Sequence, residues 1–203
     1  MNRRLILLIM SLLMINTSMA TDNILILGDS LSAGYGLKPE ENWVFLLQRQ
    51  LDKKDLKYKI VNASISGDTT ANGLNRLPHA LEQYRPKLVI LELGANDGLR
   101  GLPINYAKKN LEKIINRIHQ HQAEILLVGM RIPPNYGKKY TQAFSAIFPT
   151  LAKQYQLPLV PFMLDGVAGD PAMIQLDGLH PNALAQRRIM ENIWSHLKHL
   201  ITK

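Results

Sequence analysis

The chain has 203 residues, of which 46% are hydrophobic and none is cysteine, and its 24 Lys and Arg against 16 Asp and Glu give a formal charge of +8. A chain of this length and hydrophobicity is expected to form one folded domain rather than a disordered segment. The lack of cysteine excludes disulfides, Cys-ligated zinc, iron–sulfur clusters and a thiol nucleophile, so any chemistry must rest on Ser, Thr, His, carboxylates or a bound cofactor.

The first 20 residues have the pattern of a secretory signal peptide. Two arginines precede a largely apolar stretch over residues 5–15. Small residues, Ser18 and Ala20, occupy the positions that a signal peptidase recognises for cleavage after Ala20. The apolar stretch is shorter than the roughly 20 residues that a spanning helix needs, which favours cleavage over an uncleaved anchor. We therefore expect residues 1–20 to be removed, residues 21–203 to form a single domain, and the mature protein to be periplasmic or secreted.

The basic residues are dispersed rather than gathered in a stripe. Loss of Arg3 and Arg4 with the leader leaves a formal charge of +6. The remaining basic pairs fall in different segments without interleaved aromatic residues: Lys53-Lys54, Lys108-Lys109, Lys138-Lys139 and Arg187-Arg188. Such pairs are typical of solvated helix faces and argue against nucleic-acid binding. The positive excess is compatible with transient contact with an anionic phospholipid surface.

Short apolar runs alternate with segments of helical periodicity in the rest of the chain. The expected strands are residues 24–27, 58–61, 88–91, 125–128 and 159–162. The expected helices are residues 43–51, 69–83, 104–121, 140–154 and 181–200. Continuous apolar runs are typical of buried parallel strands. The alternation predicts an α/β fold with about five parallel strands covered by helices on both faces, and functional groups beyond the carboxyl ends of the strands.

The turn after the first expected strand contains Ser30, within Gly28-Asp29-Ser30-Leu31-Ser32. The turn matches neither the dinucleotide fingerprint nor the P-loop pattern, so nucleotide binding has little support. A serine at the end of a strand is a candidate nucleophile when a base lies nearby. A lone serine would instead cap the next helix, so the choice depends on partners elsewhere in the chain.

The turns after the second and third expected strands contain two candidate oxyanion donors. Gly67 has no side chain, so its backbone N–H can lie open toward a substrate oxygen. Asn96 carries two amide N–H groups that donate without titrating. Each also fits an ordinary turn, because glycine and Asn-Asp-Gly are common there. Asp68 is well placed to cap the helix that follows.

The loop before the last expected helix pairs an acid with a histidine. Asp177 precedes His180 by three positions, close enough in a turn for the carboxylate to accept the imidazole Nδ1–H and fix the tautomer. The chain order Ser, Asp, His fits a hydrolase triad, although the G-x-S-x-G elbow of α/β-hydrolases is absent. Ser30 is thus the predicted nucleophile, His180 its base and Asp177 the orienting group. Pro181 then suits the first turn of the helix.

Four blocks of the chain resemble, in order, the motifs of the SGNH (GDSL) hydrolases: Gly28-Asp29-Ser30-Leu31-Ser32, Ser66-Gly67-Asp68, Gly94-Ala95-Asn96-Asp97 and Asp177-Gly178-Leu179-His180-Pro181. Longer stretches around the blocks are similar to the subgroup of bacterial periplasmic thioesterases and lysophospholipases. The resemblance implies a three-layer, flavodoxin-like α/β/α fold and a triad of Ser30, Asp177 and His180. It also implies an oxyanion hole made of the N–H groups of Ser30 and Gly67 and the Asn96 side chain. No metal or other cofactor is expected.

Three hypotheses of function follow. In the first, a monomeric serine hydrolase cleaves small-molecule fatty-acyl esters and thioesters through an acyl-enzyme. The second keeps the triad and changes the substrate to an acetylated carbohydrate. The third is an exported lipid- or glycan-binding domain with inactive motifs, against which the complete constellation argues. Residues 73–80, with their leucines, and residues 131–138, with two prolines, are candidate borders of an acyl groove.

Overall fold

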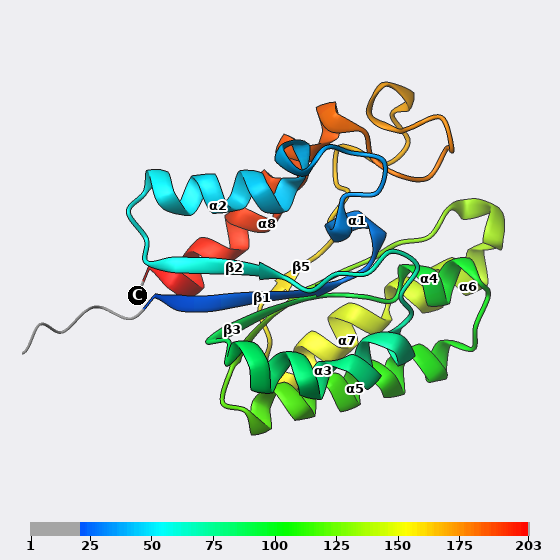
Figure 1. The fold of residues 1–203 in the computed structure, drawn as a ribbon. Coiled ribbons are helices and arrows are strands. Elements are labelled where there is room, and N and C mark those ends of the chain that lie inside the picture. The colour runs from blue at the N-terminus through cyan, green and yellow to red at the C-terminus, as the bar shows by residue number, and fades with distance from the viewer. Residues whose placement is uncertain (1–20, 203) are drawn as a thin grey trace, which may run out of the picture.

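A computed structural model describes residues 21–202, so the expected signal peptide lies outside the described residues. Figure 1 shows strands and helices alternating along the chain. The strands are β1 (Asp22–Gly28), β2 (Tyr58–Asn62), β3 (Leu88–Glu92), β4 (Glu124–Val128) and β5 (Leu159–Val160). The longer helices are α2 (Trp43–Lys53), α3 (Thr70–Tyr84), α5 (Ile104–Gln120), α6 (Lys138–Ser145), α7 (Ile147–Tyr155) and α8 (Ala183–Ile201). The short helices are α1 (Ser30–Ala33), α4 (Ala95–Leu99) and the 3-10 turns η1 (Pro39–Glu41), η2 (Pro134–Tyr136) and η3 (Pro171–Met173).

The five strands form one parallel sheet in the order β2-β1-β3-β4-β5. In its register, Ile24 of β1 lies between Ile60 of β2 and Leu88 of β3. The chain steps from β1 to its neighbour on one side and then crosses back to β3 on the other. At such a switch point the loops beyond the two strands diverge and leave a crevice at the carboxyl edge. The expected parallel sheet is confirmed, and its strand order is flavodoxin-like.

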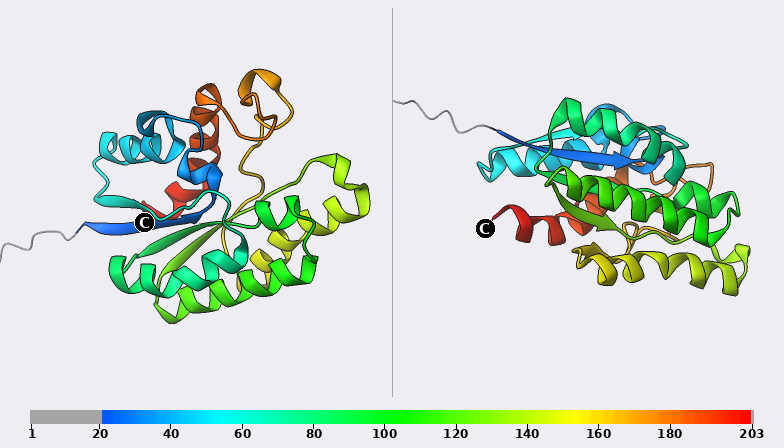
Figure 2. Two further views of the ribbon diagram at one scale, coloured as in Figure 1. Left: turned by 45° about the vertical axis from the view of Figure 1, so that its right-hand side comes forward. Right: turned by 90° about the horizontal axis from the view of Figure 1, so that it is seen from below.

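Helices cover both faces of the sheet and produce three layers. Figures 1 and 2 show α2 and α8 together on one face and α3, α5 and α7 on the other. Right-handed crossovers require this division, because the step from β1 to β2 runs opposite to the later steps along the sheet. The residues of β3 are all buried, and Ile24 to Leu27 of β1 are completely inaccessible. The apolar runs of β1 and β3 are therefore central strands covered on both sides, whereas the run of β2 is an edge strand and is only partly buried.

One predicted helix is broken into two. The periodicity predicts a single helix over residues 140–154, but α6 ends at Ser145 and α7 begins at Ile147. Pro149 explains the break, because it has no N–H to donate to the carbonyl of Ser145 and its ring clashes with that carbonyl in a continuous helix. The break is confined to Ala146, which keeps helical dihedral angles with a φ of −69° and a ψ of −16°.

Two predicted helix starts are displaced by one or two residues. Asp68 does not cap α3; Thr69 does, in a reciprocal capping box with Asn72. Pro181 does not begin α8, because Asn182 is the N-cap and its side chain accepts the N–H of Leu184 at 2.9 Å. In both cases the better capping residue stands next to the one expected.

The free edge of β2 is occupied by a side chain. The amide of Gln48 on α2 donates to the Tyr58 carbonyl at 3.1 Å and accepts the Ile60 N–H at 2.7 Å. These are backbone groups that a neighbouring strand would otherwise bind. At the other edge of the sheet, β5 has only two residues.

The described chain ends lie away from the crevice. Figure 1 places the start of β1 and the end of α8 at the amino edge of the sheet, opposite the loops that follow β1 and β3. No helix within residues 21–202 combines the length and the apolar composition that crossing a bilayer requires.

Candidate active site

Ser30 is the first residue of α1 and directly follows the turn after β1. The N-cap of α1 is Asp29, whose Oδ1 accepts the N–H of Leu31 at 3.0 Å. Asp29, rather than Ser30, therefore caps helix α1, and the Ser30 side chain is not used as a cap. The N–H of Ser30 has no partner within the helix, because the first N–H groups of a helix lack a preceding carbonyl. Its hydroxyl faces a pocket.

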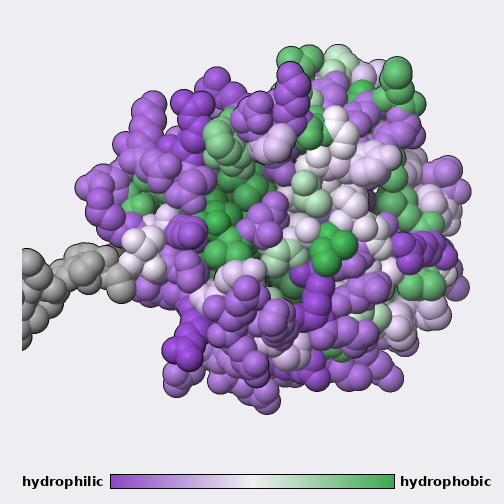
Figure 3. Space-filling model, viewed as in Figure 1, coloured by the Kyte–Doolittle hydropathy of each residue, from purple (hydrophilic) through white to green (hydrophobic). Residues whose placement is uncertain are grey.

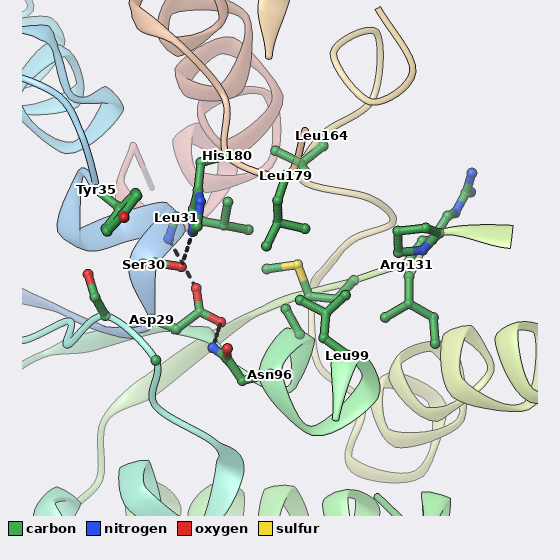
Figure 4. A pocket seen from close by; sticks show the side chains of 16 residues that line it. Asp29, Ser30, Leu31, Tyr35, Asn96, Leu99, Arg131, Leu164, Leu179 and His180 are labelled. Atoms are coloured by element: carbon green, nitrogen blue, oxygen red, sulfur yellow. Dashed lines mark hydrogen bonds between the residues drawn. The ribbon is translucent and has the colours of Figure 1, made fainter. Parts of the chain in front are cut away.

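The Ser30 hydroxyl is the end of a continuous polar chain. Its Oγ lies 2.9 Å from Nε2 of His180 (Figure 4), and Nδ1 of the same ring lies 2.6 Å from Oδ2 of Asp177. Asp177 Oδ1 accepts the backbone N–H groups of Leu179 and His180 at 2.9 and 3.0 Å. These bonds, that from the His180 N–H foremost, lower the pKa of Asp177 to about 2. The ionised carboxylate holds the proton on Nδ1 and leaves Nε2 to accept from the serine.

A hairpin loop between η3 and α8 carries both Asp177 and His180. Ile174 and Pro181 form an antiparallel bridge at its base, and Gly178 at its tip has a φ of +72°. A residue with a Cβ is strained in this left-handed conformation, so glycine suits the tip. The hairpin thus fixes the spacing of three residues that brings carboxylate and imidazole together.

Tyr35 supports the imidazole from the side. Its ring lies against that of His180, with centroids 4.4 Å apart and an interplanar angle of 33°. Gln175 ties the two loops together, because its Nε2 donates to the carbonyls of Tyr35 and Pro181 at 2.8 and 2.9 Å. The loop after α1 and the hairpin before α8 therefore form one unit around the histidine.

Gly67 and Asn96 border the same pocket from the loops after β2 and β3. Gly67 has a φ of +85°, and its N–H donates to no acceptor in the part of the chain that the structure describes. Nδ2 of Asn96 donates to Asp29 Oδ2 at 3.2 Å and to the Asp68 carbonyl at 3.0 Å. All the residues predicted for the site thus come together: Ser30, Gly67, Asn96 and His180 at the pocket, and Asp177 directly behind the imidazole.

Two buried acids, Asp29 and Glu92, lie beneath the turn that carries Ser30, and the role of Glu92 is not evident from the sequence. Glu92, at the end of β3, is inaccessible, and its Oε2 accepts the Asp29 N–H at 3.2 Å and the Ser32 hydroxyl at 2.5 Å. A Cβ on Gly28 would stand 2.6 Å from this oxygen, so only glycine fits there. Burial raises the pKa of Asp29, and burial together with the charge of Asp29 raises the pKa of Glu92 well above its ordinary value.

The remaining oxygen of Glu92 indicates which of the two acids is neutral. Its Oε1 is buried and meets no donor among residues 21–202. An ionised carboxylate would be costly in such a place, whereas a protonated one is tolerated. Asp29 accepts from Leu31 and Asn96 and lies near His180, all of which lower its pKa. Glu92 is therefore the neutral acid, and Asp29 carries the negative charge beside Asn96.

Arg76 joins the turns after β1 and β2. Its Nε donates to Asp68 Oδ2 at 2.6 Å, its Nη2 donates to the Gly28 carbonyl at 3.0 Å, and its Nη1 donates to the Ala63 carbonyl. The expectation that residues 73–80 border the acyl groove is wrong. They belong to α3, and the leucine at position 77 is buried in the core. This helix holds the loops in place and lines no part of the pocket.

The pocket beside Ser30 has a volume of about 380 Å³ and a mainly apolar wall. Its apolar lining residues are Leu31, Tyr35, Ala95, Leu99, Met130, Ile132, Pro133, Leu164 and Leu179. Figure 4 shows Leu99, Leu164 and Leu179 on the side of Ser30 away from Tyr35. Part of the segment 131–138 contributes to the wall, as expected from its sequence. The pocket combines one activated hydroxyl with an apolar channel beside it.

Comparison with known proteins identifies the family. The sequence profile of the GDSL-like Lipase/Acylhydrolase family matches residues 26–188. The chain belongs to this family. This GDSL hydrolase is 44% identical over 192 residues to Esterase TesA of Pseudomonas aeruginosa, covering 95% of this chain and 96% of the relative. It is 46% identical over 182 residues to Thioesterase 1/protease 1/lysophospholipase L1 of Escherichia coli K12, covering 90% and 86%.

The solved structures agree with the sequence relatives. A crystal structure of TesA superposes on this GDSL hydrolase with a TM-score of 0.86 at 46% identity, covering 88% of this chain and 99% of that one. The expected family, the three-layer α/β/α fold and the enzymatic class, a hydrolase of acyl esters, are confirmed.

Proposed function

We propose that this GDSL hydrolase cleaves fatty-acyl esters and thioesters with Ser30 as nucleophile, His180 as general base and acid, and Asp177 as the orienting group. The observation that carries the proposal is the unbroken chain from Ser30 Oγ through the imidazole to the carboxylate, at 2.9 and 2.6 Å. Oγ attacks the acyl carbon while Nε2 takes its proton. The imidazolium then protonates the leaving alkoxide or thiolate, and an acyl-enzyme remains. Water, deprotonated by the same imidazole, releases the acid.

The oxyanion of each tetrahedral intermediate would be held by the N–H groups of Ser30 and Gly67 and by the Asn96 side chain. The two backbone groups have the free hydrogens that this role requires. Asn96 uses its shorter bond, to the Asp68 carbonyl, to fix the amide. Its longer bond, to Asp29 at 3.2 Å, is the one a developing oxyanion would share. Asp29 in this proposal positions Asn96 and does not touch substrate.

Asn96→Ala is expected to lower kcat by about 10²–10³, the usual effect of removing one oxyanion donor. KM should change little, because the donor acts mainly in the transition state. Steady-state kinetics on a soluble ester measures both parameters, and Asn116→Ala, an exposed asparagine on α5, is the matched control. An Asn96→Ala enzyme with unchanged kcat would remove this residue from the oxyanion hole.

The acyl chain, rather than a sugar, fits the pocket wall. The wall beside Ser30 is formed by leucine, isoleucine, methionine and proline side chains, whereas its polar groups are mainly those assigned to catalysis. Carbohydrate recognition needs several further hydrogen-bonding side chains to satisfy sugar hydroxyls. The names of the relatives, which include an arylesterase and a thioesterase/lysophospholipase, support acyl esters and thioesters as substrates.

A chain-length series tests the substrate class. We expect kcat/KM for p-nitrophenyl esters, and for the matching acyl thioesters, to rise from acetate to medium chains by up to about fourfold per methylene buried. The rise should stop when the chain outgrows the pocket. A maximum at acetate in both series would favour the carbohydrate acetyl esterase hypothesis instead. The series is repeated with Ser30→Ala protein to exclude contaminating esterases.

We also propose that residues 1–20 are removed on export and that residues 21–203 act outside the cytoplasm as a monomer. The signal-like pattern of the leader supports this, and β1 begins at Asp22, close to the expected cut. The mass of the protein recovered from an expressing cell's periplasm, which should lack the leader, checks the proposal.

A further inference from the structure

Large apolar side chains that are exposed on this protein gather around the mouth of the pocket. Among residues 21–202, two of the eight such side chains, Tyr35 and Leu179, line the pocket. Four more lie within four positions of a lining residue along the chain: Ile65, Tyr136, Leu176 and Leu184. We call these six the apolar rim. Single exposed apolar residues are normal on a soluble protein, whereas a group confined to one place marks an interaction surface.

The catalytic hairpin supplies the most exposed part of the apolar rim. Leu176 and Leu179 flank the tip of the hairpin, on either side of Asp177 and Gly178. The Leu176 side chain is fully exposed, with a relative accessibility of 109%, and Leu184 on the first turn of α8 is 74% exposed. Leu179 also lines the pocket, so the rim is continuous with the channel beside Ser30.

One side of the mouth is cationic, whereas the segment 163–180, which carries the hairpin, contains Asp165, Asp170 and Asp177 and no Lys or Arg. The segment 131–139, which forms another side of the mouth, contains Arg131, Lys138 and Lys139 and no acidic residue. Arg100 lies beside the opening, where its Nη2 donates to the Gly67 carbonyl at 2.8 Å. Figure 3 shows hydrophobic residues along the upper edge of the molecule, where the segment before α8 lies, with hydrophilic residues between them. Aliphatic side chains beside cations complement a layer of acyl chains under anionic head groups.

We propose that the apolar rim docks on a phospholipid surface that contains anionic lipid, with Leu176, Leu179 and Leu184 inserted among the acyl chains. In this orientation the mouth of the pocket faces the acyl-chain region of the lipid layer. This inference rests on the proposed function only for the statement that the pocket accepts an acyl chain. A second copy of this chain and a partner protein are the competing occupants.

Vesicle binding of inactive protein tests the surface without hydrolysis of lipid. Ser30→Ala protein is mixed with phosphatidylcholine vesicles, with and without phosphatidylglycerol, and bound protein is measured by co-sedimentation. We expect binding to the anionic vesicles, weakened by salt, and a loss of affinity of about tenfold or more when Leu176→Ser and Leu184→Ser are added. The matched control adds Phe45→Ser and Tyr106→Ser, the two exposed apolar residues away from the rim. Equal binding by the rim and control variants would overturn the proposal.

Enzyme activity on soluble and on micellar substrates provides a second test of docking. In the otherwise wild-type enzyme, the same two leucine substitutions should leave hydrolysis of a soluble short-chain ester unchanged and reduce hydrolysis of lysophospholipid in anionic micelles by about tenfold. Leu184→Ser alone, outside the hairpin, should give a smaller fall in the same direction. An equal loss on both substrates would count against docking. Turnover by Ser30→Ala would contradict the proposed function while the vesicle result still stands.

Sedimentation velocity tests whether a second copy of this chain occupies the rim. If the rim binds a second copy, the wild-type protein forms a dimer that the two serine substitutions dissociate, and this result would overturn the lipid assignment. A monomer before and after substitution, together with vesicle binding, supports it.

Discussion

Ser30→Ala is expected to abolish ester and thioester hydrolysis, with a loss in kcat on the order of 10⁵–10⁶. The hydroxyl oxygen of Ser30 is the one placed 2.9 Å from the imidazole Nε2. Ser32, the nearest other serine along the chain, cannot replace it, because its buried hydroxyl is bound to Glu92 at 2.5 Å. The residual rate would come from binding and the oxyanion donors alone.

Covalent labelling provides the measurement that does not depend on substrate choice. A fluorophosphonate should add one adduct to the wild-type protein and none to Ser30→Ala. Ser66→Ala, which changes an exposed serine that also lines the pocket, is the matched control and should keep both labelling and turnover. Thermal unfolding should be similar in all three proteins. A labelled Ser30→Ala protein would mean that another residue is the nucleophile.

Asp177→Asn is expected to lower kcat by up to ~10⁴ with little change in KM. An asparagine can keep the bonds from the backbone N–H groups of Leu179 and His180, so the hairpin should survive. Its amide nitrogen can donate to Nδ1, which would place the ring proton on Nε2 and prevent that nitrogen from accepting the serine proton. Stopped-flow or steady-state kinetics on a soluble ester measures the loss in kcat.

Asp170→Asn is the matched control, because Asp170 lies in the same segment and also accepts a backbone N–H, that of Ala172 at 2.9 Å. It should keep nearly full activity. Equal kcat for Asp177→Asn and the wild-type enzyme would contradict the triad, whereas equal losses in both variants would indicate that the loop, rather than the tautomer, is affected.

The free energy of unfolding of the wild-type protein and that of Asp177→Asn should also depend differently on pH in the acid range. The hydrogen bonds to Asp177 hold its pKa at about 2, below the ordinary value of 3.8. A carboxyl whose pKa is lower in the folded state stabilises that state above the unfolded-state value and loses the contribution as the pH falls through the folded-state value. Urea unfolding should therefore show a constant difference between wild type and Asp177→Asn above pH 3.8 that shrinks toward pH 2. A difference independent of pH over this range would contradict the assigned cause.

The candidate site could be predicted from sequence because its parts lie at strand ends. Ser30, Gly67 and Asn96 each follow a short apolar run, and parallel strands bring such positions to one edge. Asp177 and His180 lie within one turn of the chain, so their pairing is local. Neither inference required knowledge of which strand neighbours which.

The supporting residues could not be predicted because they depend on contacts between distant segments. Glu92 reaches Asp29 only because the register places it beside Gly28 on the neighbouring strand. Arg76 looks like an exposed helical residue until α3 is packed beside the ends of β1 and β2. The leucines of residues 73–80 suggest a groove wall but pack in the core, because periodicity shows that a helix has an apolar face but not which surface that face covers.

On the lipid surface proposed above, the Gln48 side chain at the free edge of β2 would limit pairing between the sheets of neighbouring molecules. Molecules adsorbed on a lipid surface are concentrated and share one orientation, so open strand edges would meet often and could join sheets from neighbouring molecules. Here one edge already has its Tyr58 and Ile60 backbone groups satisfied by an amide, and the other edge offers only two residues. Under the proposed docking, adsorbed molecules would therefore present few free backbone groups at the edges of their sheets.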